Sequence, residues 1–267
     1  MKKMTKIIAA VMALALIVSM TACSQNPNNE ATNEASNEAP QGITIADIQK
    51  DGKLVVATNA EFPPFEYKDG DKITGFDMDL SAYIAEKMEV TLEISDILFD
   101  NIITSIQTGA AHIGAAGMTV KPDRLENVDF SNTYFSANQV IILKEDAAFT
   151  ATSELKDMKI GVQDGTTGAD FVRDNIKEPM GFESGALAVE AMKAGQVDCV
   201  VIDNYPAIEF VKKNDGLKIF EKPLTVEEYA IAIPKNSPEL VKAINDAIKE
   251  LQDSGEFDKL LEKYDLK

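Results

Sequence analysis

Residues 90–116, VTLEISDILFDNIITSIQTGAAHIGAA, decide the fold of this chain. Val90 to Ile94 is predicted to be a strand, because apolar residues occupy alternating positions in it. Asp100 is expected to begin a helix that carries three isoleucines and stops at Gly109. Ile113 to Ala116 then forms a short buried strand. A strand, a helix and a second strand in this order indicate a β-α-β unit.

The segment before this unit continues the alternation. Leu54 to Ala57 is predicted to be a strand, and Asp77 is expected to cap a helix that runs to Met88 with apolar side chains at helical spacing. Strands and helices that alternate along a chain favour an α/β layer fold.

The second half of the chain repeats this order. Lys159 to Val162 is predicted to be a strand, and a Gly/Thr turn and a helix follow it. A helix over 186–194 ends at Gly195 and precedes a strand over 198–202. The same order of helix end, glycine and strand is found at 106–112, so we expect two lobes that are built alike.

Two β-rich stretches, Gln139 to Leu143 and Tyr229 to Pro234, are candidates for strands that connect the lobes. A helix from Pro238 to Leu251 would then return the chain to the first lobe. A two-strand connection favours hinge motion around a cleft. The expected boundaries are 43–142 plus 231–267 for lobe 1 and 143–230 for lobe 2.

The first 22 residues are expected to be a lipoprotein signal peptide. A basic start precedes an apolar run from Ile7 to Met20, which is too short to cross a bilayer of roughly 30 Å comfortably. Met20-Thr21-Ala22-Cys23 has the pattern of a lipobox, in which Cys23 receives acyl chains such as palmitate and becomes the mature N-terminus. The alternatives are a plain cleaved signal with an incidental cysteine, or a short membrane anchor. The prediction is an extracytoplasmic protein with a lipid anchor in the cell membrane.

The segment after Cys23 is expected to be a disordered tether, so that 23–42 form one unit. Alanine is its most apolar residue, and Asn-Glu-Ala occurs in it three times. As a flexible coil the tether would span roughly 20–25 Å on average.

The charge balance excludes some partners. The whole chain has a formal net charge of −18, and removal of residues 1–22 would make it −21. Such a surface repels nucleic acid and anionic lipid, so we expect neither as a partner. We expect a monomer.

The few cysteine and histidine residues argue against metal and redox chemistry. If Cys23 carries lipid, Cys199 has no partner for a disulfide within the chain, and its apolar surroundings predict a buried small side chain. His112 is the only histidine, so a typical zinc site is not expected. We expect no cofactor, no metal and no catalytic residue.

Four clusters of candidate ligand-binding residues follow predicted strands, where open α/β sheets place their sites. They are Thr58–Phe65, Phe99, Ala116–Arg124, and Gln163–Gly168 together with Asp203.

These clusters offer what a free α-amino acid requires. A guanidinium group, here Arg124, and backbone N–H groups at a helix start suit its carboxylate. Asp203 suits its ammonium group, and Phe62 and Phe99 could enclose its side chain. Taken singly, each residue has an ordinary structural explanation, such as a solvated arginine, a helix cap or a core aromatic. Their joint position at strand ends in both halves favours a binding site.

Four segments resemble one family of proteins. They are LVVATNAEFPPFEYKDGDKITGFDMDL (54–80), AAGMTVKPDRLENVDFS (115–131), GVQDGTTGADF (161–171) and DCVVIDNYP (198–206). In order and spacing they resemble the extracytoplasmic solute-binding proteins of polar amino-acid ABC transporters. The resemblance covers roughly residues 50–265. It implies a two-lobed α/β fold of the periplasmic-binding-protein type II with two hinge strands, which closes on one L-amino acid and delivers it to a membrane permease.

The resemblance also implies roles for individual residues. Arg124 with Thr119 would bind the carboxylate, and Asp203 would bind the ammonium group. The expected substrate-binding residues are Asn59, Phe62, Phe99, Ala116, Gly117, Thr119, Arg124, Gln163, Thr166, Thr167, Gly168 and Asp203.

Asn59, Glu61 and His112 are the three positions whose residue types could bear on the charge of the ligand. Asn59 stands where many relatives have aspartate, which weakens the case for a cationic ligand side chain. Glu61 lies near the expected pocket and could restore negative charge. His112 stands where an acid is common, but away from the expected cleft. Glutamine-like, basic and cystine-like ligands therefore remain open.

Two other functions remain as alternatives. One is a sensory or adhesive surface lipoprotein without a transport role. The other is an enzyme that resembles cyclohexadienyl dehydratase, which would need a positioned acid or base in the cleft. Glu61 would be the spare acid for such a role.

Overall fold

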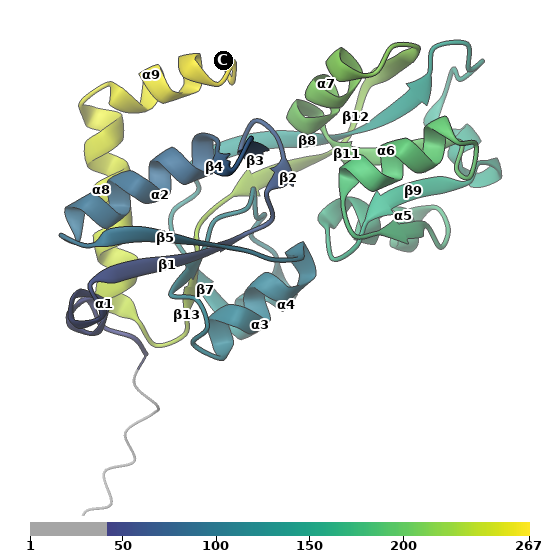
Figure 1. Ribbon diagram of the computed structural model, residues 1–267. Helices are drawn as coiled ribbons and strands as arrows, with labels where there is room; N and C mark the ends of the chain where they lie inside the picture. The colour runs from purple at the N-terminus through teal and green to yellow at the C-terminus, as the bar shows by residue number, and fades with distance from the viewer. Residues whose placement is uncertain (1–41) are drawn as a thin grey trace, which may run out of the picture. The chain divides into compact units, whose positions relative to one another are not determined.

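The computed structural model describes residues 42–267, so the predicted signal peptide, Cys23 and the tether up to residue 41 lie outside the described residues. Within the described range the strands form two five-stranded sheets and one small three-stranded sheet (Figure 1).

The first sheet has the order β5-β1-β6-β13-β7. β1 is parallel to β5 and β6, whereas β13 is antiparallel to β6 and β7. The strands are β1 (Lys53–Thr58), β5 (Thr91–Asp96), β6 (Ile113–Gly114), β7 (Val128–Phe130) and β13 (Ala232–Pro234); the helices beside them are α1 (Ile45–Asp51), α2 (Phe76–Lys87), α3 (Ile102–Gln107), α4 (Pro122–Asn127), α8 (Pro238–Asp253) and α9 (Glu256–Lys263).

Both faces of β1 are buried because helices cover each of them. Leu54 and Val56 belong to the apolar cluster that contains the buried residues of α2 and α8. Val55 and Ala57 belong to a second cluster with the isoleucines of α3. This alternation follows from the two-residue period of a strand. Figure 1 shows α2 and α3 on opposite sides of β1. The β-α-β unit predicted from residues 90–116 is present as β5, α3 and β6, whose two strands are both parallel to β1.

The start of α2 differs from the prediction. Gly75, with a φ of 135°, precedes the helix, and Asp77 lies within its first turn. The Asp77 side chain is fully buried, where it accepts hydrogen bonds from the backbone N–H of Gly117 at 2.9 Å and from the hydroxyl of Tyr134 at 2.7 Å. Asp77 thus binds groups distant in sequence instead of capping its own helix.

The C-terminal helix also differs from the prediction. α8 extends past Leu251 to Asp253, and α9 follows it. Gly255 lies between the two helices with a φ of 76°, a conformation that glycine adopts without strain.

The second sheet has the order β10-β9-β11-β8-β12. Its β9, β10 and β11 are parallel, and β8 runs antiparallel to β11 and β12. The strands are β8 (Phe135–Lys144), β9 (Ile160–Gln163), β10 (Met180–Phe182), β11 (Cys199–Asp203) and β12 (Leu217–Tyr229); the helices are η2 (Thr152–Asp157), α5 (Thr167–Asn175), α6 (Gly185–Lys193) and α7 (Asn204–Lys213). Cys199 is fully buried, as predicted, and burial raises the pKa of its thiol to about 12.

The chain passes between the two sheets twice. It leaves the first sheet after β7 and enters the second at β8, and it returns from β12 to β13. Residues 139–142, which the sequence assigned to lobe 1, pair with β11 in the second sheet. The change of sheet therefore precedes the expected boundary at 142/143. Below, the first lobe means the first sheet with its helices, and the second lobe means the second sheet with its helices.

A small antiparallel sheet follows β1. It consists of β2 (Glu61–Phe62), β3 (Glu66–Asp69) and β4 (Lys72–Thr74). Phe62 pairs with Glu66, and Glu61 pairs with Tyr67. Residues paired across a hairpin point to the same face, so Phe62 and Glu66 lie on one face and Glu61 on the other.

Candidate functional site

Residues that follow the parallel strands of both sheets line one cavity. Asn59 follows β1, Ala116 follows β6, Gln163 ends β9 and Asp203 ends β11. Parallel strands bring their carboxyl ends to the same edge of a sheet, which explains why Asn59 lies near Ala116 and Gln163 near Asp203. The cavity lies where these edges of the two sheets come together.

The cavity encloses about 330 Å³ of space between atoms, part of which is open to solvent. Every predicted substrate-binding residue except Gly168 lines it, and Glu66 lines it in addition. The lining residues are Asn59, Phe62, Glu66, Phe99, Ala116, Gly117, Thr119, Arg124, Gln163, Thr166, Thr167 and Asp203.

Arg124 supplies a buried positive charge. It lies in α4, where Pro122 occupies the first turn as predicted, and only 4% of Arg124 is exposed. Its guanidinium donates to the carbonyl oxygens of Thr119 at 2.7 Å and Gly165 at 2.9 Å. Within residues 42–267 no carboxylate lies within 4.0 Å of this guanidinium. Burial lowers the pKa of Arg124 from its ordinary value, but an arginine stays charged at neutral pH. The site therefore holds a cation that lacks an anionic partner.

Aromatic rings flank this cation and the cavity. The guanidinium carbon of Arg124 lies 5.3 Å from the ring centroid of Phe99, within the range of a cation–π contact. Phe62 packs on the backbone of Gly117, where an added Cβ would lie 2.8 Å from the Phe62 ring. Because Gly117 also has a φ of 52°, a larger residue there would be strained and would displace Phe62.

Asn59 and Gln163 connect the two lobes across the cavity. The Gln163 side-chain amide donates to Asn59 Oδ1 at 2.9 Å, and Asn59 Nδ2 donates to the carbonyl of Ile97 at 3.0 Å. Both ends of the Asn59 amide are therefore bound by protein groups. An ion pair between Lys121 and Asp170, at 2.6 Å, also joins the lobes.

The N-terminus of α5 faces the cavity. Thr166 caps this helix and accepts a hydrogen bond from the N–H of Ala169 at 3.2 Å. Thr166 and Thr167 line the cavity, whereas Gly168 lies behind it. A Cβ on Gly168 would lie 2.6 Å from the side-chain oxygen of Gln139, so a larger residue there would displace the Gln139 amide, which binds Asp203.

Asp203 supplies a buried carboxylate to the cavity. Only 7% of it is exposed. Its Oδ1 accepts a hydrogen bond from the hydroxyl of Tyr229 at 2.6 Å, and its Oδ2 accepts one from the amide of Gln139 at 2.8 Å. Burial raises the pKa of Asp203 to about 7, although both hydrogen bonds oppose this shift.

Glu66 is the residue that the sequence reasoning missed. Its side chain is fully buried, and no N–H or O–H donor within residues 42–267 reaches either carboxylate oxygen, although the Asp77 carboxyl lies within hydrogen-bonding reach. Burial, together with the nearby Asp77, raises the pKa of Glu66 well above its usual range. Glu61, nominated from the sequence as the spare acid, is exposed and does not line the cavity. The pairing of β2 with β3 turns Glu66 inward, and no feature of the sequence alone revealed that pairing.

Thr119 binds protein groups as well as lining the cavity. Its hydroxyl donates to Glu227 at 2.7 Å, and its carbonyl accepts from Arg124. Glu227 lies in β12 and is itself buried. Thr119 thus links the arginine to a strand that crosses between the lobes.

No group of three or more His, Cys, Asp or Glu side chains within residues 42–267 could hold a metal ion. None of the helices in that range has the length and apolar character needed to cross a membrane.

Comparison with known proteins identifies the family. Residues 54–267 match the sequence model of one protein family, the bacterial extracellular solute-binding proteins, family 3. The chain belongs to this family.

Individual members of family 3 are similar over most of the chain. The arginine-binding extracellular protein ArtP of Bacillus subtilis is 34% identical over 220 residues, which are 79% of this chain and 86% of ArtP. The ABC transporter glutamine-binding protein GlnH of the same organism is 29% identical over 264 residues, 96% of this chain and 95% of GlnH.

Solved structures agree on the fold. A crystal structure of a mutant of ArgBP from T. maritima has a TM-score of 0.80 and 38% identity, and covers 84% of this chain and 99% of that one. The two-lobed α/β fold predicted from the sequence is therefore confirmed. Family 3 membership also places the protein outside the cytoplasm.

The same fold includes a precursor of an enzyme. An ancestral amino acid-binding protein, described as a precursor of cyclohexadienyl dehydratase, has a TM-score of 0.78 and 34% identity and covers 82% of this chain and 98% of that one. ArtP and GlnH are named as binding proteins.

Proposed function

We propose that this family 3 protein binds a basic L-amino acid, with L-arginine as the first candidate, and presents it to the permease of an ABC transporter. The cavity that contains Arg124, Asp203 and Glu66 is the binding site. The observation that carries the proposal is a pair of unsatisfied buried groups in this one cavity: among residues 42–267, the Arg124 guanidinium has no carboxylate within 4.0 Å, and the Glu66 oxygens accept no hydrogen bond.

Each charged group of L-arginine has a partner of opposite sign in the cavity. The α-carboxylate would bind Arg124 and the amides at the start of α5, and the α-ammonium group would bind Asp203. The side-chain guanidinium would donate to Glu66, whose two oxygens are free to accept two parallel hydrogen bonds. The ligand would thereby compensate charges whose burial is costly in the empty protein.

Glu66 also changes what Asn59 implies about the charge of the ligand. A neutral residue at position 59 argued against a cationic ligand, but Asn59 is bound by Gln163 and Ile97. A cationic side chain of the ligand would stabilise the ionised form of Glu66, which would then supply the negative charge. The name of ArtP agrees with a basic ligand, whereas the name of GlnH keeps a glutamine-like ligand as the competitor.

Calorimetric titration of the protein with L-arginine, L-histidine, L-glutamine and L-cystine tests the proposal. We expect L-arginine to bind at least about 10-fold more tightly than L-glutamine, because only a cation compensates Glu66. Tighter binding of L-glutamine or L-cystine would overturn the basic-ligand assignment. Failure of all four to bind would overturn amino-acid binding in this cavity.

We further propose that the protein works as a lipid-anchored monomer. Residues 1–22 would be the signal peptide, Cys23 the lipidated residue and 23–42 the unit that contains the tether. Lobe 1 would comprise 43–142 plus 231–267 and lobe 2 would comprise 143–230, except that the chain changes sheet at the start of β8, before residue 142. The support is the lipobox pattern at Met20 to Cys23 and the polar composition of the segment after it. A short tether would hold the receptor close to a permease in the same membrane and raise its effective concentration there.

A further inference from the structure

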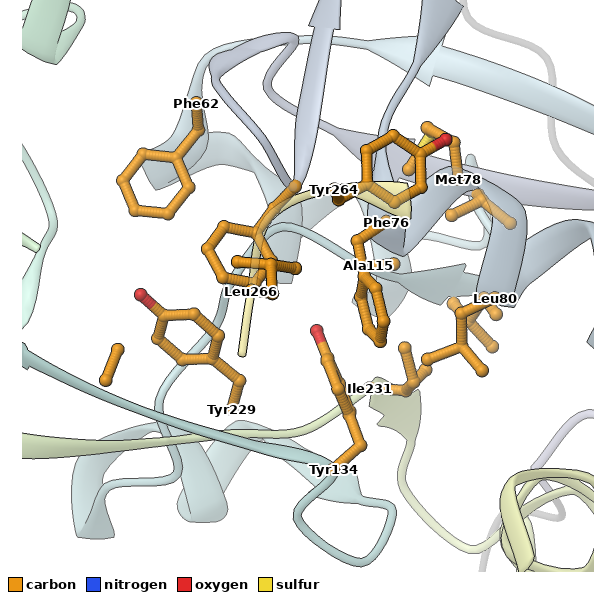
Figure 2. Packing of buried hydrophobic residues seen from close by; sticks show 14 of the residues in the cluster. Phe62, Phe76, Met78, Leu80, Ala115, Tyr134, Tyr229, Ile231, Tyr264 and Leu266 are labelled. Carbon is orange, nitrogen blue, oxygen red and sulfur yellow. The ribbon is translucent and has the colours of Figure 1, made fainter. Parts of the chain in front are cut away.

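Two tyrosines lie side by side where the chain crosses between the lobes. Tyr134 directly precedes β8, and Tyr229 is the last residue of β12. The backbone N–H of Tyr134 donates to the carbonyl of Tyr229 at 2.9 Å. Figure 2 shows both rings in the buried cluster that also contains Phe62 and Phe76. The two crossing segments are thus joined at this pair.

Each tyrosine hydroxyl binds a buried carboxylate from a different lobe. Tyr134 donates to Asp77 of the first lobe at 2.7 Å, and Tyr229 donates to Asp203 of the second lobe at 2.6 Å. Asp77 in turn holds the N–H of Gly117, whose backbone lines the cavity. Asp203 lines the cavity itself. Each crossing segment therefore contacts the site through one tyrosine–aspartate hydrogen bond. The bond of Tyr134 reaches the cavity only through Asp77 and Gly117, whereas the bond of Tyr229 reaches a residue that lines it.

We propose that Tyr229 is a positioning residue for ligand binding: its hydroxyl holds the Asp203 carboxylate ionised and oriented to receive the ligand's α-ammonium group. This inference rests on the proposed role of Asp203. Tyr229 does not line the cavity, so it would act only through Asp203.

The hydrogen bonds around Asp203 leave room for this role. Tyr229 binds one oxygen and the Gln139 amide binds the other. Each oxygen of an ionised carboxylate has two lone pairs, so one on each remains for a ligand. Held by a donor on each oxygen, the carboxylate keeps one orientation before the ligand arrives.

The charges around Asp203 make the Tyr229 bond important near neutral pH. The carboxyl groups of Glu227 and Glu66 oppose ionisation of Asp203, whereas the guanidinium of Arg124 favours it. Burial and these carboxyl groups raise the pKa of Asp203 to about 7, whereas hydrogen bonds from Tyr229, from Gln139 and from the backbone of Asp203 itself lower it. Without the Tyr229 hydroxyl more of Asp203 would be neutral at pH 7, and a neutral carboxyl is a weak partner for an ammonium group.

The substitution Tyr229→Phe tests this role because it removes only the hydroxyl. The ring stays available for its contacts with Phe65 and Phe135, whose centroids lie 5.2 and 5.9 Å away. Tyr134→Phe is the matched control, since it removes the same group from the neighbouring tyrosine and frees Asp77 instead of Asp203.

Two ligands that differ only in the α-amino group distinguish a loss of ammonium binding from a general loss of affinity. L-arginine carries it, and 5-guanidinopentanoate is the same molecule without the α-amino group. For Tyr229→Phe we expect the Kd of L-arginine at pH 7 to rise about 10-fold, since a hydrogen bond to a charged group is lost, while the Kd of 5-guanidinopentanoate changes less than about 2-fold. For Tyr134→Phe both ligands should change by the same factor.

The pKa of Asp203 provides a second measurement. Carbon-13 NMR of the ligand-free protein should give a higher pKa for Asp203 in Tyr229→Phe than in the wild type, and no such shift in Tyr134→Phe. Equal weakening of both ligands by Tyr229→Phe, or an unchanged Kd for L-arginine, would overturn the inference.

The wild-type titrations keep this inference separate from the proposed function. If L-arginine does not bind but L-histidine does, the same comparison is made with L-histidine and imidazolepropionate, because every α-amino acid carries the ammonium group. If only L-glutamine or L-cystine binds, the basic-ligand proposal fails, and the comparison is made with that amino acid and its analogue without the α-amino group. If none of the four binds, amino-acid binding in this cavity fails and the role of Tyr229 fails with it. If the wild type binds and only the variants disagree, the inference alone is wrong.

Discussion

Gln163 donates a hydrogen bond to Asn59 at 2.9 Å, and this bond joins the end of β9 in one lobe to the end of β1 in the other. Both side chains are buried and both line the cavity. The bond can form only when the two lobes are in contact, so it should stabilise the closed arrangement.

Gln163→Ala should therefore weaken ligand binding. Loss of one hydrogen bond worth roughly 0.5–1.5 kcal/mol predicts an increase in Kd of about 2- to 10-fold, mostly through faster dissociation. Stopped-flow dissociation rates and calorimetry measure both quantities. Gln107→Ala is the control, because Gln107 donates a similar bond to Asn127 within one lobe, on the surface. Equal effects of the two variants would contradict the closing role.

Arg124→Ala should abolish detectable binding. The ligand carboxylate would lose its only cationic partner in the cavity, and removal of one member of a buried ion pair costs roughly 3–5 kcal/mol, or more than about 100-fold in Kd. Arg173→Ala serves as the control, because Arg173 is exposed and pairs with Asp170. Calorimetry that gave an unchanged affinity for Arg124→Ala would rule out the assigned carboxylate site.

Glu66→Gln should change ligand preference instead of abolishing binding. We expect the affinity for L-arginine to fall by about 10- to 100-fold, because a neutral amide replaces the partner of the guanidinium, while the affinity for L-glutamine falls much less. Glu61→Gln is the control, since Glu61 is exposed. If Glu66→Gln and Glu61→Gln behave alike in calorimetry, Glu66 does not set the preference.

The same substitution should stabilise the ligand-free protein. Both oxygens of Glu66 are buried without donors, so its ionised form is unfavourable in the folded state. The melting temperature of Glu66→Gln without ligand should exceed that of the wild type at neutral pH. A lower melting temperature would show that Glu66 has a structural partner in the free protein.

The stability of the ligand-free protein should depend on pH through three buried acids. Burial raises the pKa of Glu66 well above its usual range, that of Asp77 to about 6 and that of Asp203 to about 7. A raised pKa means that the folded chain binds protons more tightly than the unfolded chain. The contribution of these groups is therefore fully present below their unfolded pKa values near 4, and it is lost as the pH rises through 6 to 7.

Melting temperatures at about pH 5 and about pH 8 measure this effect. We expect the free wild type to lose more stability over this range than Asp203→Asn, which lacks one of the three groups. Saturating L-arginine should reduce the loss, because it pairs the ionised forms, and its Kd should fall as the pH rises. The same pH dependence with and without ligand would contradict a ligand that pairs with these acids.

Cys23→Ala should release the protein from the membrane without changing its affinity. The anchor is proposed to be a lipid on Cys23, which lies outside the described residues, and the cavity uses none of the residues before Asn59. Fractionation of cells and culture medium, together with calorimetry of the released protein, provides the test. Retention of Cys23→Ala in the membrane would refute the lipid anchor.

The sequence by itself determined which elements form and where most of the site lies. Apolar strands and helices alternate from Leu54 onward, and parallel strands must align their carboxyl ends. Residues at the ends of parallel strands in one sheet, such as Gln163 and Asp203, were therefore predictable as neighbours before any coordinates. Pro122 likewise fixed the start of α4 and hence the position of Arg124.

Only the tertiary structure decided the contacts that depend on pairing between distant segments. The register of β2 against β3 turned Glu66 into the cavity and Glu61 out of it, and a shift of one residue would have reversed them. Asp77 looked like a helix cap, but Gly117 and Tyr134 bind it from segments 40 and 57 residues away. Local periodicity specifies helices and strands, whereas the partners of a buried charge are fixed only when the whole chain has packed around it.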